Sequence, residues 1–378
     1  MVRPLAELET PTLLLDEAKL DRNIVRMKAR LAGFGVPLRP HIKTAKSRDV
    51  YARALPGAVG VTVSTLAEAE YAFDHGVANI LYAVGMTPAK LDRALALRAK
   101  GAELTLTADS LEAARAIAAK GEAAHDRIPV VIEIDSDDHR AGVKPLSAAA
   151  RDIAAYLQQS IGARFGGLMT HAGGSYACRS EAAIRDAAER ERRAVVDTAA
   201  MLKADGAQSG IVSVGSTPTA TFGARFDGVT EVRVGVYMFM DLVMAGLGVC
   251  GVDDIAISVL VSVIGRQPEK GWIITDGGWM ALSRDRGTAA FPVDHGYGLV
   301  CDEAGRPIGD LIVVSCNQEH GIIARRGGGA VDPAAFPIGR LLRILPNHAC
   351  ATAAQFGAYD VIDGVGAVIA RYPRIGGW

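Results

Sequence analysis

Residues 79–121 read NILYAVGMTPAKLDRALALRAKGAELTLTADSLEAARAIAAKG, and this stretch contains the same pattern twice. Each copy is an apolar, strand-like run followed by an alanine-rich amphipathic segment. We predict strand, helix, strand and helix, in that order, at Asn79–Val84, Pro88–Lys100, Glu103–Ala108 and Ser110–Lys120. Ser110 is a suitable N-cap, and Gly101 and Gly121 are suitable helix terminators. The alternation predicts parallel strands joined by crossover helices.

The same alternation continues from about residue 36 to residue 240. Eight strands are predicted, at Leu38–Lys43, Gly60–Ser64, Asn79–Val84, Glu103–Ala108, Val130–Asp135, Phe165–His171, Ile211–Gly215 and Val232–Met238. Two further helices are predicted at Ser147–Gln158 and Ser180–Ala204. Eight parallel strands with crossover helices indicate an α/β fold of the TIM (β/α)8 barrel type. A doubly wound open sheet is the alternative, but its glycine fingerprint after the first strand is missing.

The sequence pattern changes after about residue 250, where strand-like runs lie between Gly, Pro and Asp turns. These runs are Ile255–Ile264, Trp272–Thr275, Leu311–Ser315, Gly321–Ala324, Leu341–Leu345 and Ala367–Arg371. They predict an antiparallel β domain, with which the early strand Thr12–Asp16 is expected to pair. The sequence thus predicts a barrel domain over residues 22–250 and a β domain over residues 251–378 together with residues 1–21.

Bulk properties exclude several classes of protein. The chain of 378 residues has a formal net charge of -1, so it has no overall field for nucleic acid or an anionic membrane. Its longest apolar run, Ile255–Gly265, is far shorter than the ~20 residues of a membrane span. The N-terminus does not read as a signal peptide, and five scattered cysteines favour a reducing compartment. We therefore expect a cytoplasmic enzyme with a small-molecule partner, bound neither to nucleic acid nor to a membrane.

In a barrel of this type the active site lies at the C-terminal ends of the strands. The polar or glycine-containing segments at these predicted ends are Lys43, Arg140, His171, Gly215-Ser216-Thr217 and Arg233-Val234-Gly235-Val236-Tyr237. Each has an ordinary interpretation too, because a lysine at a strand end is usually solvated. Arg140 could equally form a surface ion pair with Asp137 or Asp138.

These residue types suit a phosphorylated pyridine cofactor. A lysine at a barrel mouth is a suitable Schiff-base nucleophile. The segment Gly215–Thr219 offers backbone N–H groups and hydroxyls before a helix start, which suits a phosphate. It could also be an ordinary turn with an N-cap and a Pro in the first helical turn. Gly235 would let the backbone approach a ligand closely, and Arg140 and Arg233 could serve a phenolate oxygen and a ring nitrogen.

A second candidate site lies near the C-terminus, in Leu345-Pro346-Asn347-His348-Ala349-Cys350. On an extended segment, His348 and Cys350 would point to the same side because strand side chains alternate. An imidazole and a thiolate together can bind a cation such as Zn²⁺. The alternative is a chance spacing in which the cysteine is only a small buried hydrophobe.

Longer motifs carry a resemblance to a known family. They are Arg39–Thr44, Gly60–Thr65, Ile132–Asp135 with His139–Arg140, Thr170–Gly173, Val212–Ala220, Ser283–Ala289, Asn317–Gly321 and Asn347–Thr352. Over essentially its whole length the chain resembles the fold-type III pyridoxal-phosphate (PLP) enzymes, which have an alanine racemase-like barrel followed by a β domain. Within them it is similar to the metal-dependent branch of D-serine dehydratases, D-threonine aldolases and, most closely, D-threo-3-hydroxyaspartate dehydratases.

The resemblance implies roles for individual residues. Lys43 would bind PLP covalently, Arg140 would meet its phenolate oxygen and Arg233 would face its ring nitrogen. His348 and Cys350 would bind a divalent metal, with Zn²⁺ favoured and Mn, Co or Mg as alternatives. The other implied cofactor contacts are His171, Tyr176, Gly215, Ser216, Thr217, Gly235, Val236 and Tyr237. A homodimer is also implied.

The implied activity is that of a lyase acting on D-3-hydroxy amino acids. Threo-3-hydroxy-D-aspartate would give oxaloacetate and ammonia, and D-serine would give pyruvate and ammonia. Arg284 and Arg286 are candidates for binding the β-carboxylate, or else they pair only with Asp285 and neighbouring loops. Aldolase-type cleavage is the alternative, although aldolases commonly have an aspartate at the position of Cys350. A non-catalytic PLP carrier is disfavoured because such proteins resemble a single barrel without a β domain, and an unrelated metal-binding structural protein is the most distant alternative.

Overall fold

The computed structural model describes residues 3–378, and the chain separates into two compact units. The first, the barrel unit, consists of Met27–Gly235 with Gly377–Trp378. The second, the β unit, consists of the chain up to Arg26 together with Val236–Gly376. Residues 22–26 and 236–250, which were predicted to belong to the barrel, therefore group with the β unit.

The barrel unit is built on an eight-stranded sheet in the order β2-β9-β8-β7-β6-β5-β4-β3. In chain order the strands are β2 (Leu38–Pro40), β3 (Val61–Val63), β4 (Asn79–Gly85), β5 (Glu103–Ala108), β6 (Ile128–Ile134), β7 (Ala163–Thr170), β8 (Ile211–Val214) and β9 (Glu231–Val234). All neighbours in the sheet are parallel. A parallel bridge between His41 and Thr62 joins the segment after β2 to β3 and closes the sheet. The TIM-barrel prediction is confirmed.

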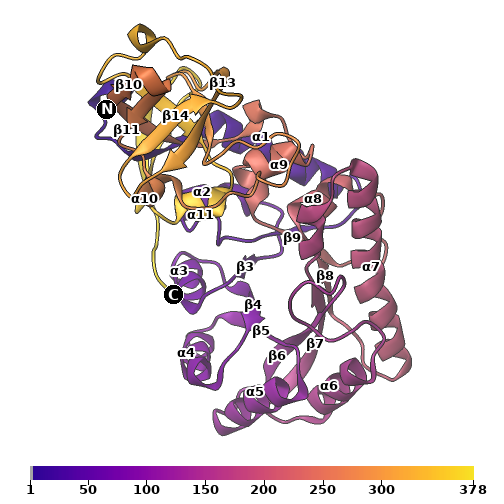
Figure 1. Ribbon diagram of the computed structural model, residues 1–378. Coiled ribbons are helices and arrows are strands. Elements are labelled where there is room, and N and C mark those ends of the chain that lie inside the picture. The colour runs from indigo at the N-terminus through magenta and orange to yellow at the C-terminus, as the bar shows by residue number, and fades with distance from the viewer. Residues whose placement is uncertain (1–2) are drawn as a thin grey trace. The chain divides into compact units, whose positions relative to one another are not determined.

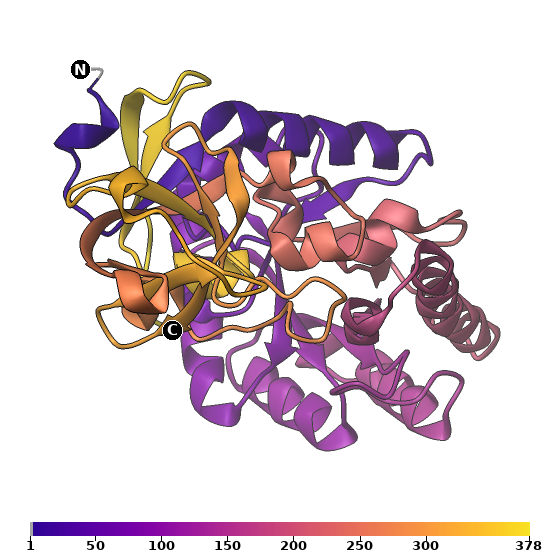
Figure 2. The same ribbon diagram turned by 45° about the horizontal axis from the view of Figure 1, so that its top comes forward.

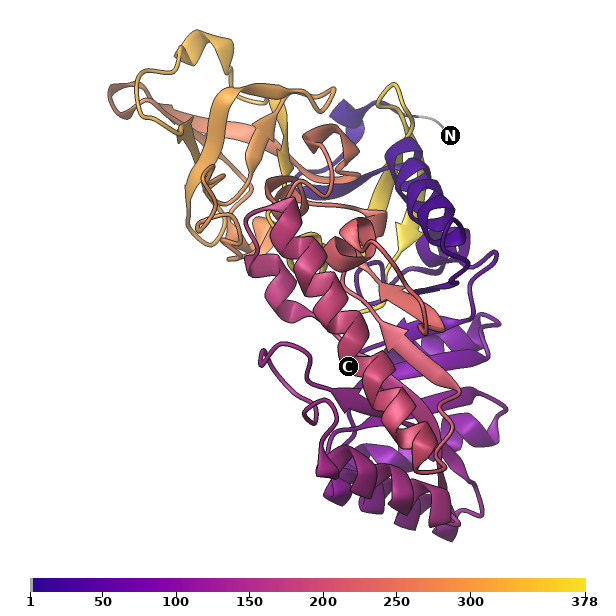
Figure 3. The same ribbon diagram turned by 90° about the vertical axis from the view of Figure 1, so that its right-hand side faces the viewer.

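Helices lie along the outside of these strands, as α4, α5, α6 and α7 show in Figure 1. The helices of the unit are α2 (Arg48–Tyr51), α3 (Leu66–Asp74), α4 (Pro88–Ala99), α5 (Leu111–Ala123), α6 (Ala148–Gln159), α7 (Glu181–Ala204) and α8 (Thr217–Phe222), with 3-10 turns η2 (Ala52–Ala54) and η3 (Gly173–Ala177). Ser110, Ser147 and Ser180 cap α5, α6 and α7 by accepting a backbone hydrogen bond three residues further on. The longest, α7, packs on β7 and β8 and is the long rose helix of Figure 3.

Three predicted boundaries were wrong. The first barrel strand ends at Pro40, so Lys43 lies in the turn that follows it. The last ends at Val234, and residues up to Met238 form the 3-10 turn η4 (Val236–Met238). Helix α5 continues past Gly121, where a Cβ atom would lie 1.9 Å from the carbonyl oxygen of Gly162. Gly121 is thus required by close packing and does not terminate the helix.

The β unit contains a nine-stranded sheet in the order β11-β14-β13-β12-β15-β10-β1-β16-β17. Its strands are β1 (Thr12–Asp16), β10 (Ile257–Gln267), β11 (Trp272–Thr275), β12 (Leu299–Cys301), β13 (Pro307–Cys316), β14 (Gly321–Arg325), β15 (Leu341–Leu345), β16 (Ala358–Ile362) and β17 (Val368–Pro373). Because β11 pairs with both β14 and β10, the strands from β10 to β15 close into a ring. Every pairing is antiparallel except that of β1 with β16.

The early strand β1 joins this sheet, as predicted, by pairing with β10 and β16. Figure 2 shows the yellow β16–β17 hairpin beside the indigo N-terminal segment. Leu14 of β1 and Leu260 of β10 share an apolar cluster with Leu5, Ile362 and Val368, and burial of these side chains fixes the N-terminal segment to the unit. Burial of Leu81, Val131 and Met169 forms a separate cluster in the barrel unit.

The remaining helices are α1 (Glu17–Ala32), α9 (Leu242–Gly246), α10 (Trp279–Leu282) and α11 (Ala349–Ala353), with 3-10 turns η1 (Leu5–Glu7), η5 (Val252–Asp254), η6 (Pro268–Lys270) and η7 (Pro333–Ala335). Among residues 3–378, no helix combines the length and the apolar character that crossing a membrane demands.

Candidate active site

Lys43 lies exposed in the turn after β2, at the C-terminal end of the barrel strands. The neighbouring His41 accepts the Lys43 backbone N–H at its Nδ1 atom, at 3.4 Å. Burial, together with the positive charges of Lys43 and Arg233, holds the pKa of His41 well below its usual range. The imidazole is therefore neutral, and its proton lies on Nε2, which is 3.2 Å from Ser64 Oγ.

Gly235 supports this turn. A Cβ atom at Gly235 would lie 2.9 Å from Thr44 Oγ1 and 3.1 Å from the carbonyl oxygen of His41. The segment that carries Lys43 therefore lies close to Gly235, and the contact of Gly235 with a ligand stays a prediction. The missing side chain of Gly235 lets the end of β9 pack directly against that segment.

His171 directly follows β7, and its Nδ1 atom lies 2.6 Å from the carbonyl oxygen of Gly215. Since a carbonyl can only accept, Nδ1 carries the proton. Burial, with smaller contributions from the charges of Lys43, Arg140 and Arg233, lowers the pKa of His171 to about 3. The ring is thus neutral with a bare Nε2 atom, and the ring of Tyr176 lies 6.3 Å away between centroids.

Seven buried side chains of the barrel unit have a polar atom without a hydrogen-bond partner among the described residues, and two of them, Arg233 and Thr217, are predicted cofactor contacts. Arg233, 5% exposed, donates from Nη2 to the carbonyl oxygen of Thr170 at 2.5 Å, whereas its Nη1 atom is unpartnered. Thr217, 1% exposed, has an unpartnered Oγ1 atom at the start of α8. Burying such groups unpaired is costly, so a bound molecule that offers acceptors would stabilise both. A pyridine nitrogen and a phosphate are acceptors of the required kind.

The loop between β8 and α8 offers fewer free donors than the sequence suggests. The Gly215 N–H is already donated to Glu191 at 2.9 Å. The Ser216 N–H is donated to Thr219 Oγ1 at 3.2 Å, as half of a capping box. The helix start after Gly215 is confirmed, but the expected phosphate cradle is reduced to groups that these contacts leave unused, Thr217 Oγ1 among them.

Arg140 lies on the loop after β6, with its side chain 55% exposed. Its Nη2 atom is 3.2 Å from Glu133 Oε1 at the end of β6. The alternative pairing with Asp137 or Asp138 was wrong, because Asp138 is paired with Lys144 and Asp137 accepts the Gly174 N–H. Glu133 therefore orients the Arg140 guanidinium at the strand ends.

In the β unit, His348 and Cys350 lie at the start of α11, where His348 is the N-cap residue. The prediction of a wholly extended segment was wrong, yet the two side chains are hydrogen-bonded to each other. Burial disfavours a charged imidazole here, but hydrogen bonds to Asp285 and Cys350 raise the pKa of His348 to about 11. Asp285 Oδ2 is 3.0 Å from His348 Nδ1, so a metal that replaced the proton on Nε2 would bind a ring already oriented by Asp285.

Two further buried residues fix this turn. Asp241, 1% exposed, accepts the N–H of Ala349 at 3.0 Å and that of Met244 at 2.9 Å. Asn347 donates to the carbonyl oxygens of Asp285 and Gly296 at 3.0 and 2.7 Å. In residues 3–378 no group of three or more His, Cys, Asp or Glu side chains could hold a metal, so His348 and Cys350 would leave coordination positions open.

Asp241 and Glu191 have no predicted role, and Asp285 is predicted only as a possible partner of Arg284 and Arg286. Asp285 falls within the quoted motif Ser283–Ala289, which was the only available signal for it. The other two carboxylates look like ordinary helix or loop residues in the sequence. Only the backbone groups that they accept from, far away in the chain, distinguish them.

Val236 and Tyr237, expected at the cofactor, lie in η4 of the β unit. Tyr237 is fully buried, and its hydroxyl has no hydrogen-bond partner within the described part of the chain. Burial raises the pKa of this phenol, which therefore stays protonated as a donor.

The two arginines expected at the substrate differ from each other. Arg286 is paired with Asp294 at 2.7 Å and lies over the ring of Tyr297. Arg284 lies over the ring of Trp279, 5.2 Å from its centroid. Neither pairs with Asp285, whose carboxylate accepts from His348 and Gly287, so that part of the alternative was wrong. Its other part, pairing with a neighbouring loop, holds for Arg286 through Asp294.

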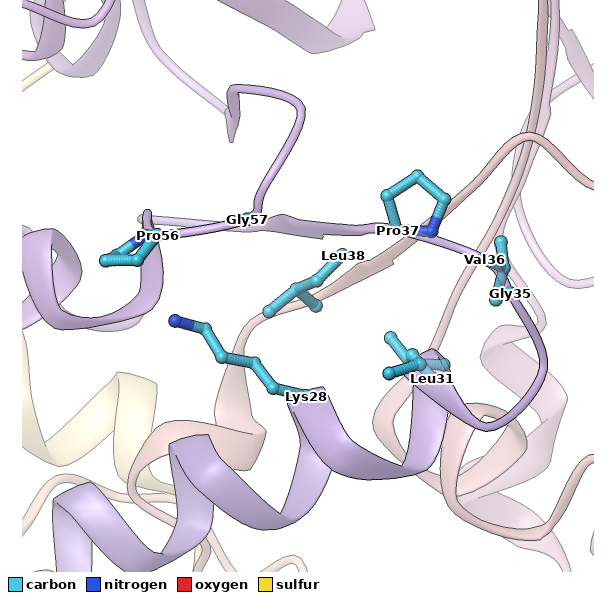
Figure 4. A pocket seen from close by; sticks show the side chains of 9 residues that line it. Lys28, Leu31, Gly35, Val36, Pro37, Leu38, Pro56 and Gly57 are labelled. Carbon is cyan, nitrogen blue, oxygen red and sulfur yellow. The ribbon is translucent and has the colours of Figure 1, made fainter.

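A pocket of about 350 Å³ in the barrel unit is a separate feature (Figure 4). It is lined by Leu31, Val36, Pro37, Leu38 and Pro56, with Lys28 at one side. Because Leu38 is the first residue of β2, the pocket lies at the N-terminal end of that strand, away from Lys43. It is not part of the candidate active site.

Comparisons with known proteins agree with this architecture. A model of the alanine racemase N-terminal domain matches residues 15–243, and one of a serine dehydratase domain matches residues 256–362. The chain is 51% identical to a D-threo-3-hydroxyaspartate dehydratase of Delftia sp. (strain HT23), over 99% of each chain. It is 30% identical to a D-serine dehydratase of Dictyostelium discoideum, over 94% of each.

A solved structure of a D-threo-3-hydroxyaspartate dehydratase variant, in which one cysteine is replaced by alanine, is described as metal-free. It matches with a TM-score of 0.97 and 49% identity, over 99% of this chain and 100% of that one. The chain therefore belongs to the fold-type III pyridoxal-phosphate enzymes, with an alanine racemase-type barrel followed by a serine dehydratase-type domain.

Proposed function

We propose that this protein is a PLP- and divalent-metal-dependent dehydratase of D-3-hydroxy amino acids. Its preferred substrate is threo-3-hydroxy-D-aspartate, which it converts to oxaloacetate and ammonia, and D-serine is a poorer substrate. The identity of 51% over nearly the whole of both chains supports this substrate class. The observation that carries the proposal is the buried, unpartnered Nη1 atom of Arg233 in the barrel whose mouth bears Lys43.

The described residues fit the cofactor. Lys43 would hold it covalently, Arg233 would donate to its ring nitrogen and Arg140 would face its phenolate oxygen. Thr217 would donate to its phosphate, with Tyr176 and the neutral His171 beside the ring. When bound, PLP supplies an electron sink for the charge that develops at the substrate Cα atom.

With the cofactor bound, Lys43 would act as the base that takes the proton from the substrate Cα atom. His41 accepts the backbone N–H of this lysine, and the missing side chain of Gly235 leaves room for the turn. His41 and His171 both stay neutral, so they add no charge near the amine. The bare Nε2 atom of His171 can accept a hydrogen bond from a substrate or cofactor group.

The pair His348 and Cys350 fits a divalent metal. Nitrogen and thiolate donors favour Zn²⁺ over Mg²⁺ or Mn²⁺, and Co²⁺ also suits them. When bound, the metal supplies a Lewis acid that helps hydroxide to leave. The chain itself orients the ligands, because Asp285 fixes the His348 ring and Asp241 fixes the Ala349 backbone between them.

The overall reaction balances without an oxidant. A proton leaves Cα and hydroxide leaves Cβ, so one water molecule is lost and an enamine is released. Tautomerisation of the enamine to an imine, followed by addition of water, gives the oxo acid and ammonia. Aldol-type cleavage would instead remove the proton of the β-hydroxyl and break the Cα–Cβ bond.

The cofactor assignment is tested by borohydride reduction of the purified protein, followed by peptide mapping. The pyridoxyl label should lie on Lys43, and the nearby Lys46 serves as an internal control because it is paired with Glu68. A label on Lys46, or a protein that retains no cofactor, would overturn the assignment. Ammonia release from threo-3-hydroxy-D-aspartate, D-serine and D-threonine then ranks the substrates.

A further inference from the structure

Glu191 is a buried carboxylate in the middle of α7 that the proposed chemistry does not use. It is 2% exposed. Its Oε1 atom accepts the N–H groups of Ala172 and Gly215, at 3.0 and 2.9 Å. Its Oε2 atom accepts the Thr219 hydroxyl at 2.6 Å. Burial raises the pKa of Glu191, and these three hydrogen bonds act against that rise.

The three donors belong to the two loops that form one side of the candidate site. Ala172 follows His171 after the end of β7, whereas Gly215 directly follows β8 and Thr219 lies in the first turn of α8. The same loops are joined by His171 Nδ1 to the Gly215 carbonyl at 2.6 Å. Among residues 3–378, Glu191 is therefore the single side chain that bonds to both loops and to the helix start at once.

This arrangement determines which donors remain for a ligand. Glu191 accepts the Gly215 N–H and orients Thr219 by accepting its hydroxyl proton. Thr219 in turn takes the Ser216 N–H within the capping box. What the loop then presents without a partner is the buried Oγ1 atom of Thr217. Movement of the Gly215–Thr219 loop would free the N–H groups of Gly215 and Ser216 and displace the Thr217 hydroxyl. All three groups lie within this five-residue segment.

We propose that Glu191 is a positioning residue that sets the geometry of the Gly215–Thr219 loop and thereby the affinity for the cofactor phosphate. The inference rests on the proposed function, because the phosphate is that of the proposed PLP. Glu191 acts from behind the loop and does not touch the cofactor. Removal of the Glu191 carboxylate should therefore lower the affinity for the phosphate selectively. It should have no direct effect on the groups that face the pyridine ring.

Equilibrium binding to the full-length apoprotein tests this, with PLP and with pyridoxal, which lacks the phosphate. Glu191→Ala should raise the Kd for PLP by roughly 10- to 100-fold. It should leave the Kd for pyridoxal within about twofold of wild type. Glu191→Gln should behave like wild type, because its carbonyl oxygen can accept both backbone N–H groups and its amide can donate to Thr219. Glu189→Ala is the matched control, since Glu189 lies on the same helix and pairs only with Arg192 among the described residues.

Glu191→Asp draws the carboxylate back by one methylene group, and Thr219→Val removes one of the three contacts. Both should show the same phosphate-selective loss, so the proposal stays testable if Glu191→Ala does not fold. Equal losses for PLP and pyridoxal, or no loss for either, would overturn it. A wild-type apoprotein that binds PLP no more tightly than pyridoxal would instead overturn the cofactor assignment in the proposed function.

Discussion

His348 Nδ1 lies 3.0 Å from Asp285 Oδ2, so a carboxylate orients the imidazole proposed as a metal ligand. Carboxylate partners of this kind fix the tautomer of a ligating histidine and raise its basicity. We expect Asp285→Ala to weaken metal binding by roughly 10- to 100-fold. Competition with a chromophoric chelator measures it. Asp310→Ala, which removes a surface partner of Arg325, is the control, and equal affinities for the two variants would show that Asp285 has no such role.

Removal of the metal should stop catalysis without releasing the cofactor. His348 and Cys350 belong to the β unit, whereas Lys43 and Arg233 belong to the barrel unit. We therefore expect exhaustive chelation, and separately Cys350→Ala, to abolish turnover while the absorption of bound PLP stays largely unchanged. Readdition of Zn²⁺ should restore the chelated wild type only. Full dehydration activity in either metal-depleted protein would refute a catalytic role for the metal.

Substrate preference should depend on Arg284 more than on Arg286. Arg286 is already paired with Asp294, whereas Arg284 stacks on Trp279 beside Asp285, the partner of His348. A guanidinium can bind a β-carboxylate through two hydrogen bonds. We expect Arg284→Met to lower kcat/KM for threo-3-hydroxy-D-aspartate at least about tenfold relative to D-serine. Arg286→Met is the matched control, and parallel losses on both substrates for Arg284→Met would assign Arg284 a structural role.

The depressed pKa of His171, about 3, should appear in the pH dependence of stability. Below pH ~6.5 the unfolded chain gains a proton at this residue while the folded protein does not. The free energy of unfolding therefore falls as the pH drops from ~6.5 towards the folded pKa, and His171 contributes up to about 2 kcal/mol of that loss between pH 7 and pH 5. Denaturant unfolding of wild type and His171→Gln at both pH values isolates the effect. Identical pH dependence in the two proteins would contradict it.

Much of the barrel could be predicted because its signals are local. The helices of residues 79–121 and the caps Ser147 and Ser180 follow from periodicity and composition. Strand ends were harder, since β2 and β9 stop where Gly235 packs against the His41–Thr44 turn, a contact between distant residues. The strands β12 and β16 were missed because β12 has three residues and β16 pairs with the remote β1.

In the candidate site, too, the residues with local sequence signals could be predicted and those that act through distant contacts could not. Lys43, His171, Arg233, His348 and Cys350 were identified as candidates because their residue types and motifs are distinctive in the sequence. The residues that hold them were not, because Glu191, Asp241 and Asp285 act through hydrogen bonds to groups distant in the chain. Those bonds depend on the fold, and no local pattern encodes them.

The identity of the products tests the central claim most directly. Purified protein with PLP and Zn²⁺ is incubated with threo-3-hydroxy-D-aspartate, and oxaloacetate, ammonia, glycine and glyoxylate are quantified together, with and without chelator. We expect oxaloacetate and ammonia in equal amounts, no glycine, and loss of both products when the metal is removed. Glycine and glyoxylate as the main products would show that the protein is an aldolase and that dehydration is not its reaction.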